Sequence, residues 1–177
     1  QLTISASADA AQSVYAADVD GDGDIDVLSA SLFDDKIAWH ENTDGLGTFA
    51  ERVISIIADG AQSVYAADVD GDGDIDVLSA SGNDDKIAWY ENTDGLGTFA
   101  ERAISTNANG ALSVFAADVD GDGDVDVLSA SNDVGNSNDK IAWYENTDGL
   151  GTFGSEQVIS IDDAYGASSV YAADVDG

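Results

Sequence analysis

The sequence repeats itself at intervals of about fifty residues, and this repetition constrains the fold more than any other feature of the chain. The segment SVYAADVDGDGDIDVLSAS begins at Ser13 and again at Ser63, a close variant begins at Ser113, and SSVYAADVDG closes the chain. Residues 14–50 and 64–100 differ at three of 37 positions, which are Leu32/Gly82, Phe33/Asn83 and His40/Tyr90. Such units are expected to fold alike and to pack against one another.

Each unit predicts four short strands that are separated by turn residues. In the second unit the predicted strands are Ser63–Ala67, Asp76–Ser81, Lys86–Asn92 and Phe99–Ser105. Alternation along KIAWYEN places Ile87, Trp89 and Glu91 on one face, and Asp94-Gly95 is a strong hairpin signal. No helical period is present, so we predict an all-β fold of antiparallel strands.

Four strands in about fifty residues is the size of a β-propeller blade. The predicted units are residues 10–59, 60–109 and 110–165, with a partial fourth unit at 166–177 and a surface-loop insert around Asn132–Asn138. A propeller needs about four to eight blades to close. The chain therefore predicts about 3.5 blades, which fits half of a seven-bladed ring formed with another copy, a fragment of a longer chain, or an open assembly.

Three tryptophans recur at the same place in the units, at Trp39, Trp89 and Trp143. We predict that they pack between neighbouring blades, because a single four-stranded sheet cannot bury both of its faces. The alternative is an exposed aromatic platform for carbohydrate.

Each unit carries an acidic loop, DVDGDGDID at Asp18–Asp26 and Asp68–Asp76 and DVDGDGDVD at Asp118–Asp126. Carboxylates at every second position suit Ca²⁺, which takes six to eight oxygen ligands. The loop is not an EF-hand, because serine replaces the glutamate that an EF-hand needs at position twelve and because strands flank it. The predicted side-chain ligands are Asp18, Asp20, Asp22 and Asp26, then Asp68, Asp70, Asp72 and Asp76, then Asp118, Asp120, Asp122 and Asp126.

The seventh loop position has a different predicted part. We expect the backbone carbonyls of Asp24, Asp74 and Asp124 to bind the ion while their side chains face solvent. Asp174 and Asp176 supply half of a fourth site, which another segment would have to complete.

Other readings of the loops are weaker. Mg²⁺ prefers six-fold geometry with retained waters, and transition metals favour His or Cys, of which the chain has only His40. An acidic turn without any cation would bring several like charges together, which is unfavourable.

The repeated segment resembles the FG-GAP/VCBS repeat, the blade unit of integrin α-subunit propellers and of many secreted bacterial proteins. Asp68, Asp70, Asp72, Gly73 and Asp76 match the D-x-D-x-D-G-x-x-D calcium loop of that family. The resemblance covers essentially the whole chain. It implies calcium at the periphery of each blade, which stiffens the hairpin, and adhesion or ligand binding by loops.

The resemblance is closer to the secreted bacterial type than to integrins. Gln12-Ser13 and Gln62-Ser63 stand where the family has Phe-Gly, and Ser-Ala-Ser replaces Gly-Ala-Pro. The sequence has no Arg-Gly-Asp and no inserted metal-dependent adhesion domain, so integrin-type ligand binding is not implied.

The charge balance excludes several classes of partner. The chain has 36 acidic and five basic side chains, for a formal charge of -31, and the three complete loops hold 15 of the acids. Nucleic acids and anionic membranes are bound through Lys and Arg, so neither is expected. No apolar run approaches the ~20 residues of a spanning helix, so no membrane insertion is expected. With no cysteine, disulfides and thiol chemistry are excluded.

These observations favour a non-catalytic, calcium-binding extracellular or cell-surface module for adhesion, ligand binding or assembly. The alternatives are a lectin-like propeller, a self-assembling surface or filament protein, and, less favoured, a fragment of a secreted hydrolase. Serine-type catalysis would need a histidine base, and His40 occupies a position that Tyr90 and Tyr144 fill in the other units. Expected partners are another copy or the rest of a longer chain, and an extracellular protein or glycan.

Overall fold

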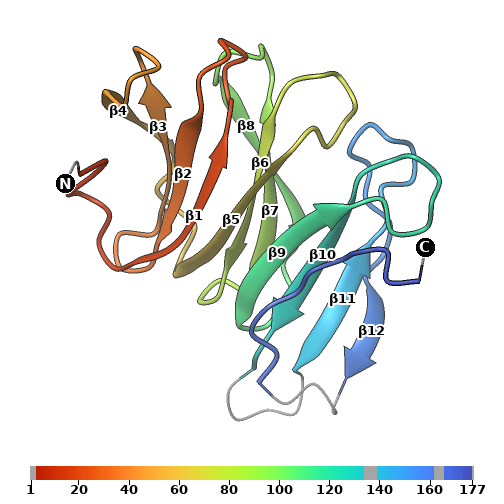
Figure 1. Ribbon diagram of the computed structural model, residues 1–177. Coiled ribbons are helices and arrows are strands. Elements are labelled where there is room, and N and C mark those ends of the chain that lie inside the picture. Colours follow the sequence, from red (N-terminus) through yellow and green to blue (C-terminus); the bar gives the residue numbers. More distant parts are fainter. Residues whose placement is uncertain (1–2, 134–138, 162–165, 177) are drawn as a thin grey trace.

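The strands of the chain form three separate sheets that stand one beside the next (Figure 1). The computed structural model describes residues 3–133, 139–161 and 166–176, and within these ranges it has strands and no helix. The strands are β1 (Ala11–Ala17), β2 (Asp26–Ser31), β3 (Lys36–Asn42), β4 (Phe49–Ser55), β5 (Ala61–Ala67), β6 (Asp76–Ser81), β7 (Lys86–Asn92), β8 (Phe99–Ser105), β9 (Ala111–Ala117), β10 (Asp126–Ser131), β11 (Lys140–Tyr144) and β12 (Gln157–Ile161).

Each sheet is an antiparallel meander in which strands pair in chain order, β1-β2-β3-β4, β5-β6-β7-β8 and β9-β10-β11-β12. Three of the four strands predicted for the second unit have the predicted bounds, and the first begins earlier, at Ala61. The register shifts between Ala61 and Ser63, so the alternating pattern is visible in the sequence only from Ser63 onward. The prediction of all-β blades with four antiparallel strands is confirmed.

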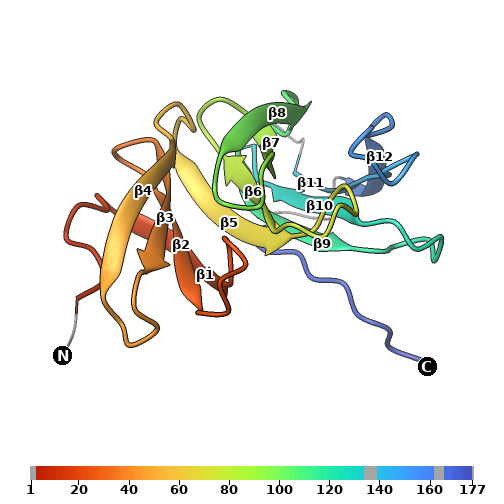
Figure 2. The ribbon, with the colours of Figure 1, turned by 90° about the horizontal axis from the view of Figure 1, so that it is seen from above.

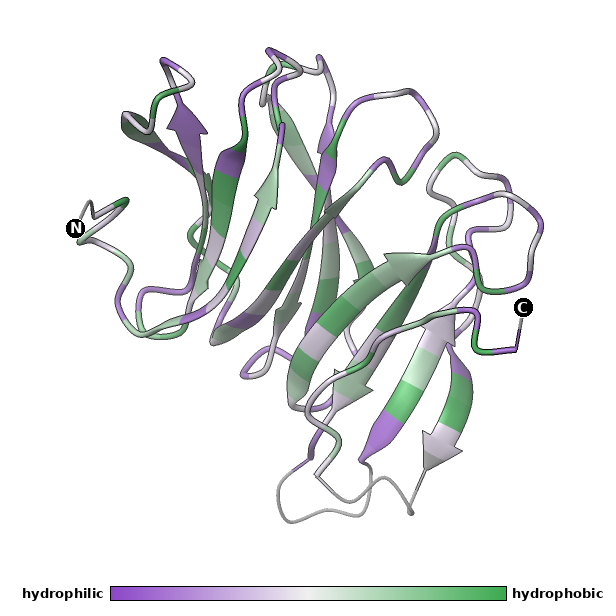
Figure 3. Ribbon diagram, in the orientation of Figure 1, coloured by the Kyte–Doolittle hydropathy of each residue, from purple (hydrophilic) through white to green (hydrophobic). Residues whose placement is uncertain are grey.

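The three sheets stand next to one another (Figure 2), and hydrophobic residues run along the strands of each of them (Figure 3). Apolar side chains fill the space between neighbouring sheets. One face of the first sheet packs on the opposite face of the second, and the second packs on the third in the same way. The first cluster contains Leu28, Ala30, Ile37 and Trp39 from the first blade and Ala58, Ala61, Val64, Val77 and Tyr90 from the second. A blade therefore becomes stable by covering its neighbour.

The first strands of the blades, β1, β5 and β9, lie next to one another. Their aromatic side chains form a row, with ring centroids 4.5 Å apart for Tyr15–Tyr65 and 4.8 Å apart for Tyr65–Phe115. The final described segment, 166–176, continues the row, because Tyr171 lies 4.6 Å from Phe115. It does so without belonging to any of the three sheets.

The tryptophans confirm the inter-blade prediction at two positions. Trp39 and Trp89 are each 2% exposed, whereas Trp143, on the last blade, is only half-buried. No following blade covers Trp143 within the described part of the chain. Closure of a ring therefore stays a prediction.

Two further expectations concern segments rather than blades. Most of the predicted insert around Asn132–Asn138 lies outside the described residues. No helix of the described residues is long and apolar enough to cross a membrane.

Candidate metal centre

Each acidic loop joins the first strand of a blade to the second, at the same end of all three sheets (Figure 1). In each loop the carboxylates at positions one, three and five converge, with one oxygen from each lying within 4.8 Å of the others. The three groups are Asp18, Asp20 and Asp22, then Asp68, Asp70 and Asp72, then Asp118, Asp120 and Asp122. The repeat thus builds the same triad of oxygen donors three times.

Backbone amides of the loop hold these carboxylates in place. In the first loop Gly23 N donates to Asp18 Oδ2 at 3.0 Å, and Asp22 N donates to Asp20 Oδ1 at 3.3 Å. Gly23 has φ +94°, a conformation that a residue with a Cβ rarely adopts, so the chain can turn there and bring Asp22 back toward Asp18. The alternation of Asp and Gly therefore sets the geometry of the triad.

One oxygen in each of the first two triads accepts no hydrogen bond. Asp18 Oδ1 and Asp68 Oδ1 are shielded from solvent and have no partner among the described residues. A buried carboxylate oxygen without a partner is costly, and a bound cation would satisfy it. The donor set is made only of oxygen, which suits a hard divalent cation.

The aspartate at position nine of the loop has a structural role, because it accepts hydrogen bonds from two backbone amides. Asp26 is 1% exposed, and its two oxygens accept hydrogen bonds from Val19 N at 3.1 Å and Asn42 N at 2.7 Å. Asp76 makes the same pair of contacts in the second blade, and burial raises its pKa to about 6. This carboxylate ties the loop to the third strand. Whether it also binds the ion stays a prediction.

The side chain at position seven is partly exposed, and it also has a neighbour that the sequence did not predict. Asp24, Asp74 and Asp124 lie against the turn between the third and fourth strands, where their carboxylates occupy the space beside Gly45, Gly95 and Gly149. A Cβ at those glycines would collide with the carboxylate. The glycine in the NTDGLGT turn is what makes room for this approach. The role of the three backbone carbonyls in binding the ion stays a prediction.

The loops coincide with a known sequence family. The FG-GAP-like repeat matches residues 18–79, 68–129 and 118–177, which together span most of the chain. The chain belongs to the FG-GAP-like repeat family. No curated protein matches it.

The electrostatics of the FG-GAP-like loop favour a counter-charge. Burial raises the pKa of the Asp20 carboxyl, and burial together with the neighbouring Asp72 charge raises that of Asp70. Ionising these two carboxyls is thus less favourable in the protein alone than it is for a free aspartate. A divalent cation beside them would reverse the effect by attracting the charged form.

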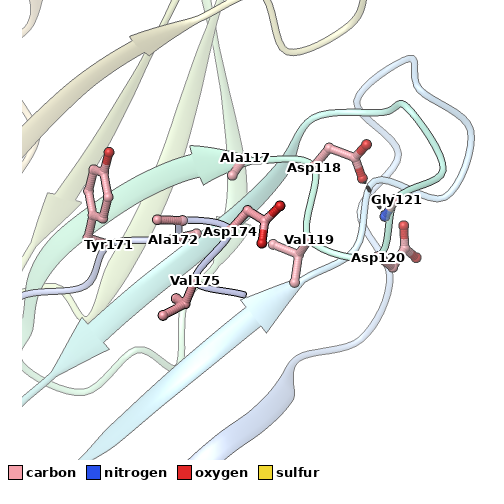
Figure 4. A pocket seen from close by; sticks show the side chains of 10 residues that line it. Ala117, Asp118, Val119, Asp120, Gly121, Tyr171, Ala172, Asp174 and Val175 are labelled. Carbon is pink, nitrogen blue, oxygen red and sulfur yellow. Dashed lines mark hydrogen bonds between the residues drawn. The ribbon is translucent and has the colours of Figure 1, made fainter. Parts of the chain in front are cut away.

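The third FG-GAP-like loop differs from the other two in its surroundings. Its three carboxylates are exposed, and Asp118 Oδ1 accepts a hydrogen bond from Gly121 N at 2.7 Å. Beside it lies a hollow of about 780 Å³, lined by the loop and by the segment that contains Asp174 (Figure 4). Asp176 N donates to Asp174 Oδ1 at 3.2 Å, which starts a fourth loop. Completion of this fourth site by another segment stays a prediction.

The asparagine that begins the NTDGLGT turn was not singled out from the sequence, yet it links neighbouring blades. Asn92 Nδ2 donates to Val19 O of the preceding blade at 3.0 Å and to Ile75 O at 3.1 Å. Asn146 bonds to Val69 O in the same way, at 2.9 Å. The sequence signal that could have found it is the recurrence of this asparagine at the start of the turn in all three repeats.

Proposed function

We propose that this chain is a non-catalytic, calcium-stabilised extracellular or cell-surface repeat module that serves adhesion, ligand binding or assembly. The observation that carries the proposal is the triad of aspartates in each loop, with oxygens within 4.8 Å of one another. The unpartnered oxygens of Asp18 and Asp68 support it, because a bound cation would give each of them a partner. Membership in the FG-GAP-like family supports a propeller-like module.

Calcium would act on stability. The triad lies between the first two strands of a blade, so an ion bound there would hold the hairpin together and relieve repulsion between carboxylates. An ion that binds only the folded chain stabilises it by about 2.7 kcal/mol per site at a concentration one hundred times Kd. Protons compete for the same oxygens, so this gain is expected to shrink at acid pH.

A thermal melt tests the proposal. With millimolar Ca²⁺ we expect Tm to rise by roughly 15 °C or more over the value in chelator, and Mg²⁺ to give less. Asp72→Asn removes one oxygen donor and should lower the gain, whereas Asp59→Asn removes one exposed charge outside the loops and should not. Equal melting with calcium and with chelator would refute structural calcium.

A lectin-like module is the second candidate for ligand binding. Its sugar platform would need exposed aromatic rings, and burial of Trp39 and Trp89 speaks against the tryptophans in that role. A glycan array probed with calcium and with chelator separates the two, since binding in neither condition would remove the lectin.

A hydrolase is less well supported. His40 Nε2 and Ser29 Oγ lie 3.0 Å apart, but both side chains are buried inside the blade. His40 Nδ1 accepts no orienting contact from a described residue. Both residues line a small hollow on the first blade, but a Ser–His pair acts on substrate only if a third group also orients the histidine.

A further inference from the structure

The two end faces of the stack are more exposed than the equivalent faces between blades, and their residues are complementary to each other. The head is the face of the first blade that no described blade covers. The tail is the opposite face, on the third blade, which no described blade covers either. Val14, at the head, is 69% exposed, whereas its equivalents Val64 and Val114 are 3% and 4% exposed. Val119, at the tail, is 38% exposed, against 1% for Val19 and Val69.

The joints inside the chain show how head and tail surfaces fit. Trp39 packs against Gly97 of the next blade, and Trp89 packs against Gly151, so closely that a Cβ on either glycine would collide with the indole ring. The tail presents Trp143, which is half-buried. The head presents Gly47, which has no atom within 4 Å of the place where its Cβ would be. The open space beside Gly47 matches the partly exposed ring of Trp143 in the way that Gly97 matches Trp39.

The polar contacts of the joint recur in the same way. Asn92 and Asn146 each donate to the carbonyl of a valine in the preceding loop, Val19 and Val69. At the head, Asn42 Nδ2 donates within its own blade, to Ile25 O at 3.2 Å. Val119 O at the tail is the equivalent acceptor, so the head carries the donor and the tail carries the acceptor of one further joint.

The head is already built as a joint surface. Lys36 Nζ donates to Ser7 O at 3.0 Å, as Lys86 Nζ does to Ile57 O at 3.4 Å where the first two blades meet. A hollow of about 270 Å³ remains there, lined by Ile4, Val14, Val27, His40 and their neighbours. The N-terminal segment thus lies on the first blade much as the β4–β5 linker lies on the second.

We propose that the tail of one chain docks on the head of a second copy, and that two copies close a six-bladed ring through two such joints. The occupant is a copy of this chain because the two faces carry the residues with which blades of this sequence already pack. Two chains of three blades give six, within the range of about four to eight in which propellers close. Head-to-tail joints that close leave neither face exposed.

The segment 166–176 competes for the same place. Residues 169–176 have the same sequence as residues 13–20, and Val170 N donates to Ser113 Oγ at 3.3 Å, the contact that Val64 makes with Ser13 at 3.3 Å. The segment pairs with no second strand in the described structure, whereas β1 is paired with β2 along its length. On docking, β1 of the second copy therefore displaces this segment from β9, and Tyr15 replaces Tyr171 beside Phe115.

Sedimentation velocity from low micromolar to several hundred micromolar tests the proposal, with millimolar calcium so that folding is not in question. We expect a species of twice the chain mass of 18.1 kDa. Val14→Asp places a charge in the joint and should weaken the pair at least roughly 30-fold. Val53→Asp, on the exposed outer strand β4, is the matched control and should leave it unchanged. Circular dichroism checks that both variants fold.

Two further variants keep the test decisive. Gly47→Ala adds a methyl group where Trp143 of the other copy would pack, and this methyl meets no atom in the isolated chain. The variant should weaken the pair, and it keeps the test open if Val14→Asp fails to fold. Val170→Asp loosens the competing segment and should tighten the pair.

Monomers at every concentration, or pairing that Val14→Asp and Gly47→Ala leave intact, would overturn the proposal. Species larger than a pair would overturn the six-bladed ring, and weaker pairing by Val170→Asp would overturn displacement. Chelation affects calcium-dependent folding, so failure of the calcium proposal is seen separately in the melt.

Discussion

The first and second blades have nearly the same sequence and different environments. Residues 14–50 and 64–100 differ at three of 37 positions, yet Val14 is 69% exposed and Val64 is 3% exposed. The backbone pairing is the same in both, with Val14 opposite Ser29 and Val64 opposite Ser79. Strand formation is therefore a property of the repeat, whereas burial is a property of having a neighbour. Substitutions at equivalent positions can therefore measure how much the neighbouring blade contributes to the free energy of unfolding.

The largest difference is expected for a charge in the joint. Val64→Asp buries an unpaired carboxylate between two blades and should cost about 4 kcal/mol or more in the free energy of unfolding. Val14→Asp introduces the same group at an exposed position and should cost less than about 1 kcal/mol. Urea unfolding with calcium, at concentrations where the chain is monomeric, gives both values. Equal losses would show that the two strands do not differ in burial.

The second comparison concerns two glycines with the same backbone strain. Gly97 has φ +90° and Gly47 has φ +96°, so an alanine at either costs about 1 kcal/mol through its conformation. At Gly97 the added methyl also collides with Trp39, which should bring the loss to about 2–4 kcal/mol. The difference between the two variants in unfolding free energy is the packing of one tryptophan between blades. If Gly47→Ala lost as much as Gly97→Ala, that assignment would fail.

A smaller difference is expected at the asparagines. Asn92→Ala removes the bond to Val19 O of the preceding blade as well as contacts within its own blade, whereas Asn42→Ala removes only the contacts within a blade. The extra loss in the second blade should be about 1 kcal/mol, the net worth of one such hydrogen bond. Urea unfolding with calcium measures both losses, and equal losses would show that the bond to Val19 O adds nothing to stability.

The smallest effect is expected at position 40, where the blades differ in residue type. Burial lowers the pKa of His40, with Glu51 and Lys36 as the charged groups that face it, so the fold favours the neutral ring. Its contribution to stability is full above the unfolded pKa of about 6.5 and is lost as the pH falls below that value. Melting of the chain at neutral and mildly acid pH, with saturating calcium, follows this loss.

The matched variant is His40→Tyr, which restores the residue found in the second blade. Ser79 Oγ donates a hydrogen bond to the Tyr90 hydroxyl at 3.3 Å, and Ser29, which lies beside His40, can donate to a tyrosine at position 40 in the same way. We expect a gain of about 0.5–2 kcal/mol and a flatter dependence on pH between neutral and mildly acid conditions. An unchanged dependence would mean that another group titrates.

Much of the fold and of the candidate site followed from the sequence. Period-two strands, Asp-Gly turns and a repeat of about fifty residues are local signals, so the strand bounds and the four-stranded blades could be predicted. The convergence of Asp18, Asp20 and Asp22 was also predictable, because alternating Asp and Gly fix a short loop.

The fine placement of the other acids could not be predicted in the same way. Asp24 lies against a turn that is distant in sequence, and both oxygens of Asp26 hold backbone amides, one of which belongs to the third strand. Such contacts depend on how strands pair and not on the order of residues in the loop.

The sequence by itself determined what one unit is, namely four strands with an acidic loop, because local backbone preferences and oxygen donors are written in each repeat. Only the tertiary structure decided which copies of the same residue are buried. Trp39 and Trp143 are equivalent in sequence, but one has a glycine of the next blade against its ring and the other does not. Burial depends on the neighbouring surface, and the sequence of a repeat is the same whether or not another blade covers it.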